Sequence, residues 1–130
     1  MEKMHGREKQ GGFTLLEVII AIGVLTIGIL AVASMQMSSI RGNAFAGATS
    51  EATTWAVDRI EKLMVLPYDD AALDPSGNPH SQAQGRYTVT WNVTADSIIS
   101  GTKTVDVAVT WSDHGAARKV TMSFTLGQVV

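Results

Sequence analysis

The chain has 130 residues, which is enough for one small domain and little more. Its 10 Lys and Arg residues against 12 Asp and Glu residues give a net charge of -2, so the chain lacks the general basic field that draws proteins onto nucleic acids. The complete lack of cysteine excludes disulfides, thiolate catalysis and cysteine-ligated metal sites.

The first segment, residues 1–12, is polar and carries the basic residues Lys3, Arg7 and Lys9. Basic residues that flank an apolar span are retained on the cytoplasmic side of a membrane. The pattern therefore predicts a cytoplasmic N-terminus and translocation of the remainder. A secretory signal places its small-residue cleavage site after the apolar core, whereas here the small pair Gly11–Gly12 precedes it.

An apolar run without any charge follows from Val18 to Ile40. About 20 such residues span the hydrocarbon core of a bilayer as a helix. The rest of this small chain has too little mass to surround a helix of this length on all sides. We therefore predict that residues 13–41 form a membrane-spanning helix, in which Gly23 and Gly28 allow other helices to approach closely.

One acidic residue, Glu17, lies at the start of this apolar segment. A charged side chain inside an apolar span costs about 2.5–3.5 kcal/mol on insertion scales, which marks it as a candidate functional residue. The alternative is that Glu17 lies at the level of the lipid headgroups and is solvated.

After Arg41 the pattern becomes amphipathic, and we predict a helix over residues 42–66 that Pro67 terminates. Asp58 and Lys62 are four residues apart in the favourable order for a salt bridge along a helix. Apolar positions recur at steps of three and four and are expected to face the core: Phe45, Ala48, Ala52, Trp55, Ala56, Ile60, Leu63 and Met64.

Residues 67–85 hold all three prolines of the chain and are predicted to form a surface loop. Asp69, Asp70 and Asp74 lie in this loop but lack the spacing and the terminal Glu of an EF-hand, so we expect solvated carboxylates and no metal site. No cofactor is expected either.

The last segment, residues 86–127, alternates apolar and polar positions and predicts a three- to four-stranded antiparallel sheet. The simplest topology is a three-stranded meander with turns over residues 95–101 and 112–118. The expected fold class is α+β, in which the long N-terminal helix packs on the sheet. The apolar positions are Tyr87, Val89, Trp91 and Val93, then Val105, Val107, Val109 and Trp111, then Val120, Met122, Phe124 and Leu126.

The sequence lacks a nucleophile elbow, a phosphate-binding loop and a dinucleotide-binding glycine motif. We therefore predict that the protein is not an enzyme and has no catalytic residues. Nucleic-acid binding is not expected, because acidic residues outnumber basic ones after residue 41.

The stretch Gly12-Phe13-Thr14-Leu15-Leu16-Glu17, placed between a basic leader and an apolar helix, resembles the N-terminal signature of type IV prepilins and type II secretion pseudopilins. The resemblance implies that prepilin peptidase removes residues 1–12 by cutting after Gly12, that Phe13 is N-methylated, and that Glu17 acts in subunit assembly. It also implies an inner-membrane assembly platform, membrane lipid before assembly, and other major and minor pilins bound through the N-terminal helix. Residues 42–130 would then form a periplasmic head.

Within this family, several features are similar to PilV-type minor pilins: Gly28-Ile29-Leu30, Gln36, the helix end at residues 58–63 and the C-terminal hairpin at residues 107–113. This resemblance implies a structural subunit that takes part in filament initiation or a tip complex. The I-type pseudopilin of type II secretion is a close alternative. A signal-anchored periplasmic adaptor that never polymerises is another. A major pilin is disfavoured by the lack of a proline in the helix and of a C-terminal cysteine pair.

Overall fold

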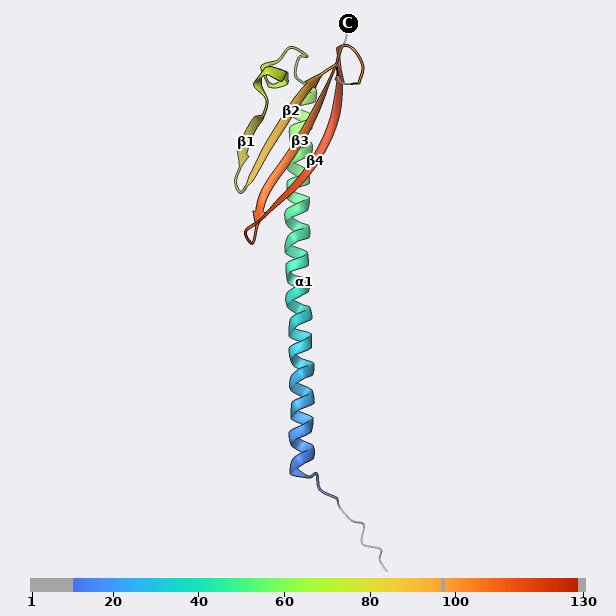
Figure 1. Cartoon of the computed structure of the whole chain (residues 1–130), viewed down its shortest axis with the longest axis vertical. Coiled ribbons are helices and arrows are strands. Elements are labelled where there is room, and N and C mark those ends of the chain that lie inside the picture. Colours follow the sequence, from blue (N-terminus) through green and yellow to red (C-terminus); the bar gives the residue numbers. More distant parts are fainter. Residues whose placement is uncertain (1–10, 97, 129–130) are drawn as a thin grey trace, which may run out of the picture. The chain divides into compact units, whose positions relative to one another are not determined.

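The computed structural model describes residues 11–96 and 98–128, so most of the predicted leader, residues 1–10, lies outside the described part of the chain. The elements are α1 (Leu15–Met64), the 3-10 helices η1 (Ala71–Leu73) and η2 (Pro75–Gly77), and the strands β1 (His80–Gln84), β2 (Tyr87–Ala95), β3 (Thr102–Asp113) and β4 (Ala116–Gly127) (Figure 1). This architecture confirms the predicted α+β class, with a long N-terminal helix and an antiparallel sheet.

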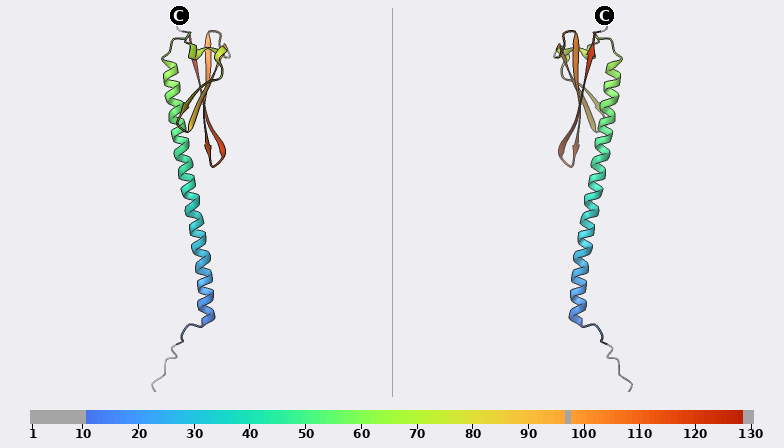
Figure 2. Two further views of the ribbon diagram at one scale, coloured as in Figure 1. Left: turned by 90° about the vertical axis from the view of Figure 1, so that its left-hand side faces the viewer. Right: turned by 90° about the vertical axis from the view of Figure 1, so that its right-hand side faces the viewer.

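The chain divides into two compact units, Met1–Arg41 and Gly42–Val130. In the second unit, which we call the head, the C-terminal part of α1 lies on one face of the sheet (Figure 2). Ala48, Ala52 and Ala56 follow one another at steps of four and are at most 5% exposed. Because these side chains are small, the helix backbone lies close to the sheet.

Large side chains of the two central strands fill the core beneath these alanines. The alternation predicted for these strands is confirmed, since each apolar position is at least 93% buried. These positions are Tyr87, Val89, Trp91 and Val93 in β2, and Val105, Val107, Val109 and Trp111 in β3. Leu63 at the end of α1 and Leu73 in η1 complete the core.

Two positions predicted to face the core do not. Phe45 is 41% exposed, and the Arg118 guanidinium lies 5.1 Å from the centre of its ring. Met64 is 55% exposed because it is the last residue of α1 and follows Leu63, the last residue of this helix that is buried in the core. The predicted salt bridge of α1 is present, with 2.8 Å between Lys62 Nζ and Asp58 Oδ2.

The sheet has the strand order β1-β2-β3-β4, and every neighbouring pair is antiparallel. Strand β1 lies inside residues 67–85, which the sequence predicted to be a loop, so that prediction is wrong for this segment. Its five residues lack apolar alternation and are mostly exposed. Backbone pairing with β2, from His80 opposite Trp91 to Gln84 opposite Tyr87, makes it a strand.

The turn between β3 and β4 is shorter than the predicted residues 112–118. It consists of His114 and Gly115, whose φ angles are +50° and +82°. Two central residues with positive φ are typical of the tight hairpin turn that matches strand twist. The strands therefore extend to Asp113 and resume at Ala116.

Side chains hold the segment between α1 and β1 against the sheet. Asn78 accepts a hydrogen bond from the Val93 N–H at 2.8 Å and donates one to the Val93 carbonyl at 2.7 Å. Trp91 Nε1 donates to the Ala72 carbonyl at 2.9 Å. Lys103 Nζ is buried, donates to the Tyr68 carbonyl at 2.6 Å and lies 4.2 Å from the centre of the Tyr68 ring.

Candidate functional site

Helix α1 begins with a capped first turn. Thr14 immediately precedes the helix, and its Oγ1 accepts a hydrogen bond from the Glu17 backbone N–H at 3.2 Å. A Thr followed three residues later by Glu is the sequence pattern of a capping box, in which the hydroxyl satisfies a backbone donor that the helix leaves free. Thr14 was not among the predicted functional residues, although the pattern Thr14-x-x-Glu17 indicates this cap.

Glu17 occupies this first turn, where the partial positive charge of a helix N-terminus stabilises a carboxylate. The Glu17 side chain borders a shallow groove along α1 together with Phe13, and the other lining residues are apolar. The structure therefore brings two of the three predicted site residues, Phe13 and Glu17, to one groove, in which Phe13 precedes α1 and Glu17 lies in its first turn. Phe13 itself is 83% exposed.

The third predicted site residue, Gly12, has no internal structural reason to be glycine. A Cβ built at Gly12 meets no atom within 4 Å, and the φ of this residue lies outside the left-handed region that favours glycine. The peptide bond between Gly12 and Phe13 is also exposed on both sides. Any requirement for glycine at this position must therefore come from a molecule that binds the segment.

The apolar part of α1 presents its side chains to the surroundings. Every residue from 11 to 40 is exposed in the chain. Helix α1 contains a stretch that is long and apolar enough to cross a membrane, and none of this stretch is buried. Large aliphatic side chains make up much of this surface. For example, Ile27 is 70% exposed and Leu30 is 64% exposed. Such a surface needs lipid or other apolar helices around it.

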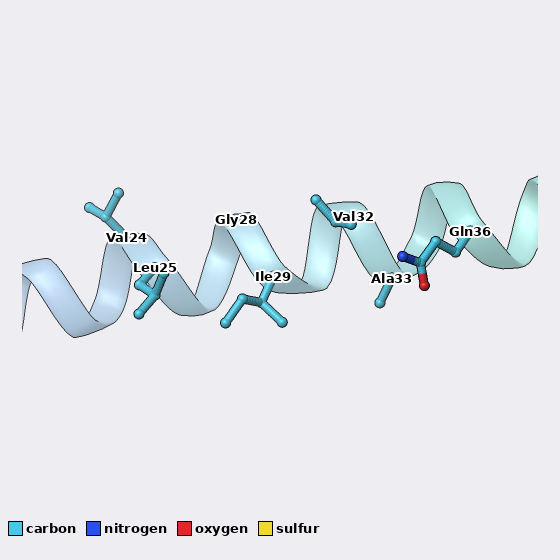
Figure 3. Close-up of a pocket in the computed structure, with 7 residues that line it drawn as sticks. All are labelled: Val24, Leu25, Gly28, Ile29, Val32, Ala33 and Gln36. Atoms are coloured by element: carbon cyan, nitrogen blue, oxygen red, sulfur yellow. The ribbon is translucent and has the colours of Figure 1, made fainter.

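A second groove lies farther along the same part of α1, and Figure 3 shows its lining residues: Val24, Leu25, Gly28, Ile29, Val32, Ala33 and Gln36. Its volume is about 570 Å³. Gly28 carries no side chain and Ala33 carries one carbon, so the larger neighbours rise on either side of a hollow. A groove of this kind accepts a ridge of another apolar helix or a lipid chain.

Comparison with known proteins bears on this N-terminal segment. Residues 7–33 match the family model described as the prokaryotic N-terminal methylation motif. The chain carries a prokaryotic N-terminal methylation motif. This motif spans Gly12, Phe13 and Glu17 and most of the groove that contains Gly28. Comparison with curated proteins and with solved structures gave no match.

The methylation motif supports a type IV pilin-like or pseudopilin protein, and it implies processing by prepilin peptidase in the context of pilin assembly. Together with the exposed apolar helix, the motif fits a membrane-anchored protein. The motif covers only the N-terminal segment, so the role of the head must be argued from its own residues.

Two of the three acidic residues of the segment after α1, Asp70 and Asp74, cap short helices, while Asp69 is exposed. Asp70 accepts the backbone N–H of Ala72 at 2.8 Å and caps η1, while Asp74 accepts that of Ser76 at 2.8 Å and caps η2. The hydrogen bonds from Ser76 lower the pKa of Asp74. Within residues 11–96 and 98–128, no group of three or more His, Asp or Glu side chains is arranged to hold a metal ion.

Proposed function

We propose that the protein is a structural minor pilin of a type IV pilus, which takes part in filament initiation or in a tip complex and has no enzymatic activity. The observation that carries this proposal is the methylation motif at the start of an exposed apolar helix. A helix whose exposed surface is mostly apolar is suited to pack among other helices in a filament, and lipid solvates it before assembly.

In this proposal prepilin peptidase hydrolyses the peptide bond between Gly12 and Phe13 and releases residues 1–12. The new amine at Phe13 is then N-methylated and stays positively charged at neutral pH. The exposure of this peptide bond and the open space around Gly12 are consistent with recognition by an enzyme. Lys3, Arg7 and Lys9 favour a cytoplasmic leader and a periplasmic head in the inner membrane.

Glu17 would then pair with the Phe13 amine of an adjacent subunit. Glu17 follows Phe13 by four residues, and four residues of a continuous helix rise about 6 Å at 1.5 Å per residue. In apolar surroundings two opposite charges attract each other strongly, whereas a single unpaired charge is costly. The pair would thus set the axial offset between neighbouring subunits.

The first test is mass spectrometry of filaments sheared from cells. Trypsin has no site between Phe13 and Arg41, so a processed chain releases the single peptide 13–41 with a methylated N-terminus. A minor pilin predicts this peptide at a few per cent or less of the dominant subunit. A trimmed protein that is absent from sheared filaments and present in the inner membrane would instead identify a pseudopilin, and an untrimmed protein would identify a membrane-anchored adaptor.

Two variants test the assigned residues. Gly12→Glu is expected to leave the leader attached, so a normally trimmed variant would refute the assigned cleavage site. Glu17→Ala is expected to be processed normally but to be depleted from filaments. The matched control is Glu61→Ala, which removes an exposed carboxylate from the head part of α1 and should leave incorporation unchanged. Equal incorporation of both variants would refute the pairing of Glu17.

A further inference from the structure

One side of α1 in the first unit carries a line of residues at alternating steps of four and three. On a helix with 3.6 residues per turn, these steps keep the side chains on one face, and they are typical of the contact between two helices that cross at a small angle. Leu25, Ile29 and Gln36 of this line extend to the same side of the helix in Figure 3. We call the line the seam, and its residues are Val18, Ile22, Leu25, Ile29, Val32 and Gln36.

The seam is accessible and uncharged along its length. All six of its residues are exposed, and four of them line the groove of about 570 Å³ described above. Gly28 and Ala33 border the seam in the same groove, and such small residues let the backbone of another helix approach closely. The only charged residue between positions 11 and 40 is Glu17, which does not belong to the seam. A second apolar helix therefore meets no charge there.

Gln36 distinguishes a helix from lipid as the occupant of this seam. Its exposed side chain lies in the charge-free run from Val18 to Ile40 and borders the groove. A carboxamide carries two N–H donors and one C=O acceptor. Lipid acyl chains offer neither kind of partner, whereas polar side chains of a neighbouring helix form hydrogen bonds across the contact. A carboxamide is also complementary to another carboxamide, because each donates to the carbonyl of the other.

We propose that the seam is the contact between two copies of this chain in the membrane, packed as a parallel and in-register helix pair. The two-fold axis runs along the helices, so both copies cross the membrane in the same direction and keep residues 42–130 on the same side. Each residue then lies level with its own copy, and Gln36 meets Gln36. Such a contact uses the same surface on both copies and closes as a dimer.

This dimer differs from the contact proposed for a filament. Pairing of Glu17 with the Phe13 amine of an adjacent subunit requires two chains that are offset by about four residues, or about 6 Å along the axis. The in-register dimer has no axial offset and does not use Glu17. It requires that the apolar part of α1 lies in a membrane, but it requires neither leader cleavage nor a filament.

Disulfide crosslinking tests the proposed contact directly, because the chain has no cysteine of its own. Axes of packed helices are about 8–10 Å apart and Cα atoms lie about 2.3 Å from each axis, so facing Cα atoms are about 4–6 Å apart. This separation is within reach of a disulfide. Full-length Ile22→Cys and Ile29→Cys, each reconstituted in phosphatidylcholine liposomes, are expected to form covalent dimers on mild oxidation. An antiparallel pair meets itself at one height only, so crosslinking at both positions requires parallel helices.

Isoleucines on the other side of the helix provide matched controls. Ile20 and Ile27 each precede a seam isoleucine by two residues, which is a rotation of about 200°. Ile20→Cys and Ile27→Cys should therefore remain monomeric. Dimers of these controls as abundant as those of the seam variants would overturn the proposal. The absence of dimers at Ile22→Cys and Ile29→Cys would overturn it as well, and would leave lipid as the occupant of the seam.

A mixed pair tests the register. Leu25→Cys and Ile29→Cys chains in the same liposomes should each crosslink to their own copy in preference to each other. Preferential crosslinking between the two variants would show a contact with an offset of four residues, as in the filament model, and would refute the in-register dimer.

Sedimentation equilibrium of the full-length chain in detergent micelles tests the role of Gln36 without a cysteine. Gln36→Leu is expected to raise the dissociation constant of the dimer about three- to tenfold, the range that corresponds to one interhelical hydrogen bond. Ser34→Leu, two residues away on the other side of the helix, should leave it unchanged. Equal constants for Gln36→Leu and the wild type, or equal effects of both variants, would overturn the proposal. These samples contain no peptidase and no other pilin, so the outcome is separable from that of the minor-pilin proposal.

Discussion

Removal of the Tyr87 hydroxyl tests how the start of β2 is held to α1. The Tyr87 ring is 2% exposed, and its hydroxyl lies 2.7 Å from Glu51 Oε2, to which it donates, and 2.7 Å from Arg86 Nη2, from which it accepts. Tyr87→Phe keeps the buried ring and removes these hydrogen bonds, together with the longer one of 3.3 Å that the hydroxyl donates to the Ala48 carbonyl. Bonds to charged groups contribute about 1.5–3 kcal/mol when desolvated.

The expected cost is at the low end of that range. The Glu51 and Arg86 side chains are 54% and 58% exposed, so water replaces much of what they lose in the variant. We therefore expect Tyr87→Phe to lower the free energy of unfolding by about 1 kcal/mol at pH 7. All three tryptophans lie in the head, so tryptophan fluorescence during urea unfolding of the full chain in detergent reports this unit alone.

The pH dependence provides a second and sharper readout. Burial, together with the hydrogen bond to Glu51, raises the pKa of Tyr87 above its usual value of 10.0. The folded state therefore favours the neutral phenol, and this contribution to stability is fully present below pH 10 and is lost as the pH rises through the folded pKa. The wild-type advantage over Tyr87→Phe should accordingly shrink as the pH rises above 10 and through the raised pKa of the folded state. A difference between the two proteins that stays constant over this range, or a loss above about 3 kcal/mol at pH 7, would refute the reasoning.

Three further substitutions in the head have expected outcomes in the same unfolding assay. Val107→Ala removes two carbons from a fully buried position and should cost about 2–3 kcal/mol, whereas Val65→Ala, at an 82% exposed position, should cost less than about 0.5 kcal/mol. Gly115→Ala places a Cβ at a φ of +82° and should cost about 1–2 kcal/mol; no loss would contradict the described hairpin turn. Asp74→Asn should destabilise the head near pH 6, where the hydrogen bonds from Ser76 hold the pKa of Asp74 below 3.8. The difference in free energy of unfolding between the variant and the wild type should decrease as the pH falls through that lowered pKa. A difference that persists at pH 2 would show that the Asn side chain itself causes the loss.

The elements that the sequence predicted correctly are those in which packing follows a regular period. The period-two alternation of β2 and β3 was readable because both strands bury one face completely. The helix period of residues 48–63 was readable for the same reason, since Ala52 and Ala56 are fully buried. Phe45 and Met64 continue the apolar period of the helix but lie beyond the ends of the core. Hydropathy alone therefore predicted a longer buried face of the helix than the structure has.

Strand β1 was not predictable from side chains, because its formation depends on backbone pairing to β2 and not on an apolar face. The short turn at His114–Gly115 was more accessible, because a residue that tolerates positive φ followed by glycine is a recognised hairpin signal. The cap formed by Thr14 was likewise present as a Thr-x-x-Glu pattern.

For the candidate site, the sequence predicted Gly12, Phe13 and Glu17, and the structure adds that Phe13 and Glu17 border one groove. The sequence could not indicate this groove, because the groove depends on how side chains of successive turns are arranged in space.

The complete exposure of residues 11–40 has a consequence for how variants of this protein should be classified. These residues make no buried contact within the chain, so a substitution there leaves the melting curve of an isolated subunit unchanged while it alters the fit to lipid or to a neighbour. A substitution at a core position of the head changes the melting curve first. A loss-of-function variant that unfolds at the wild-type temperature therefore has its defect on a surface that contacts other molecules. A thermal unfolding scan is enough to separate the two kinds of variant before any filament is examined.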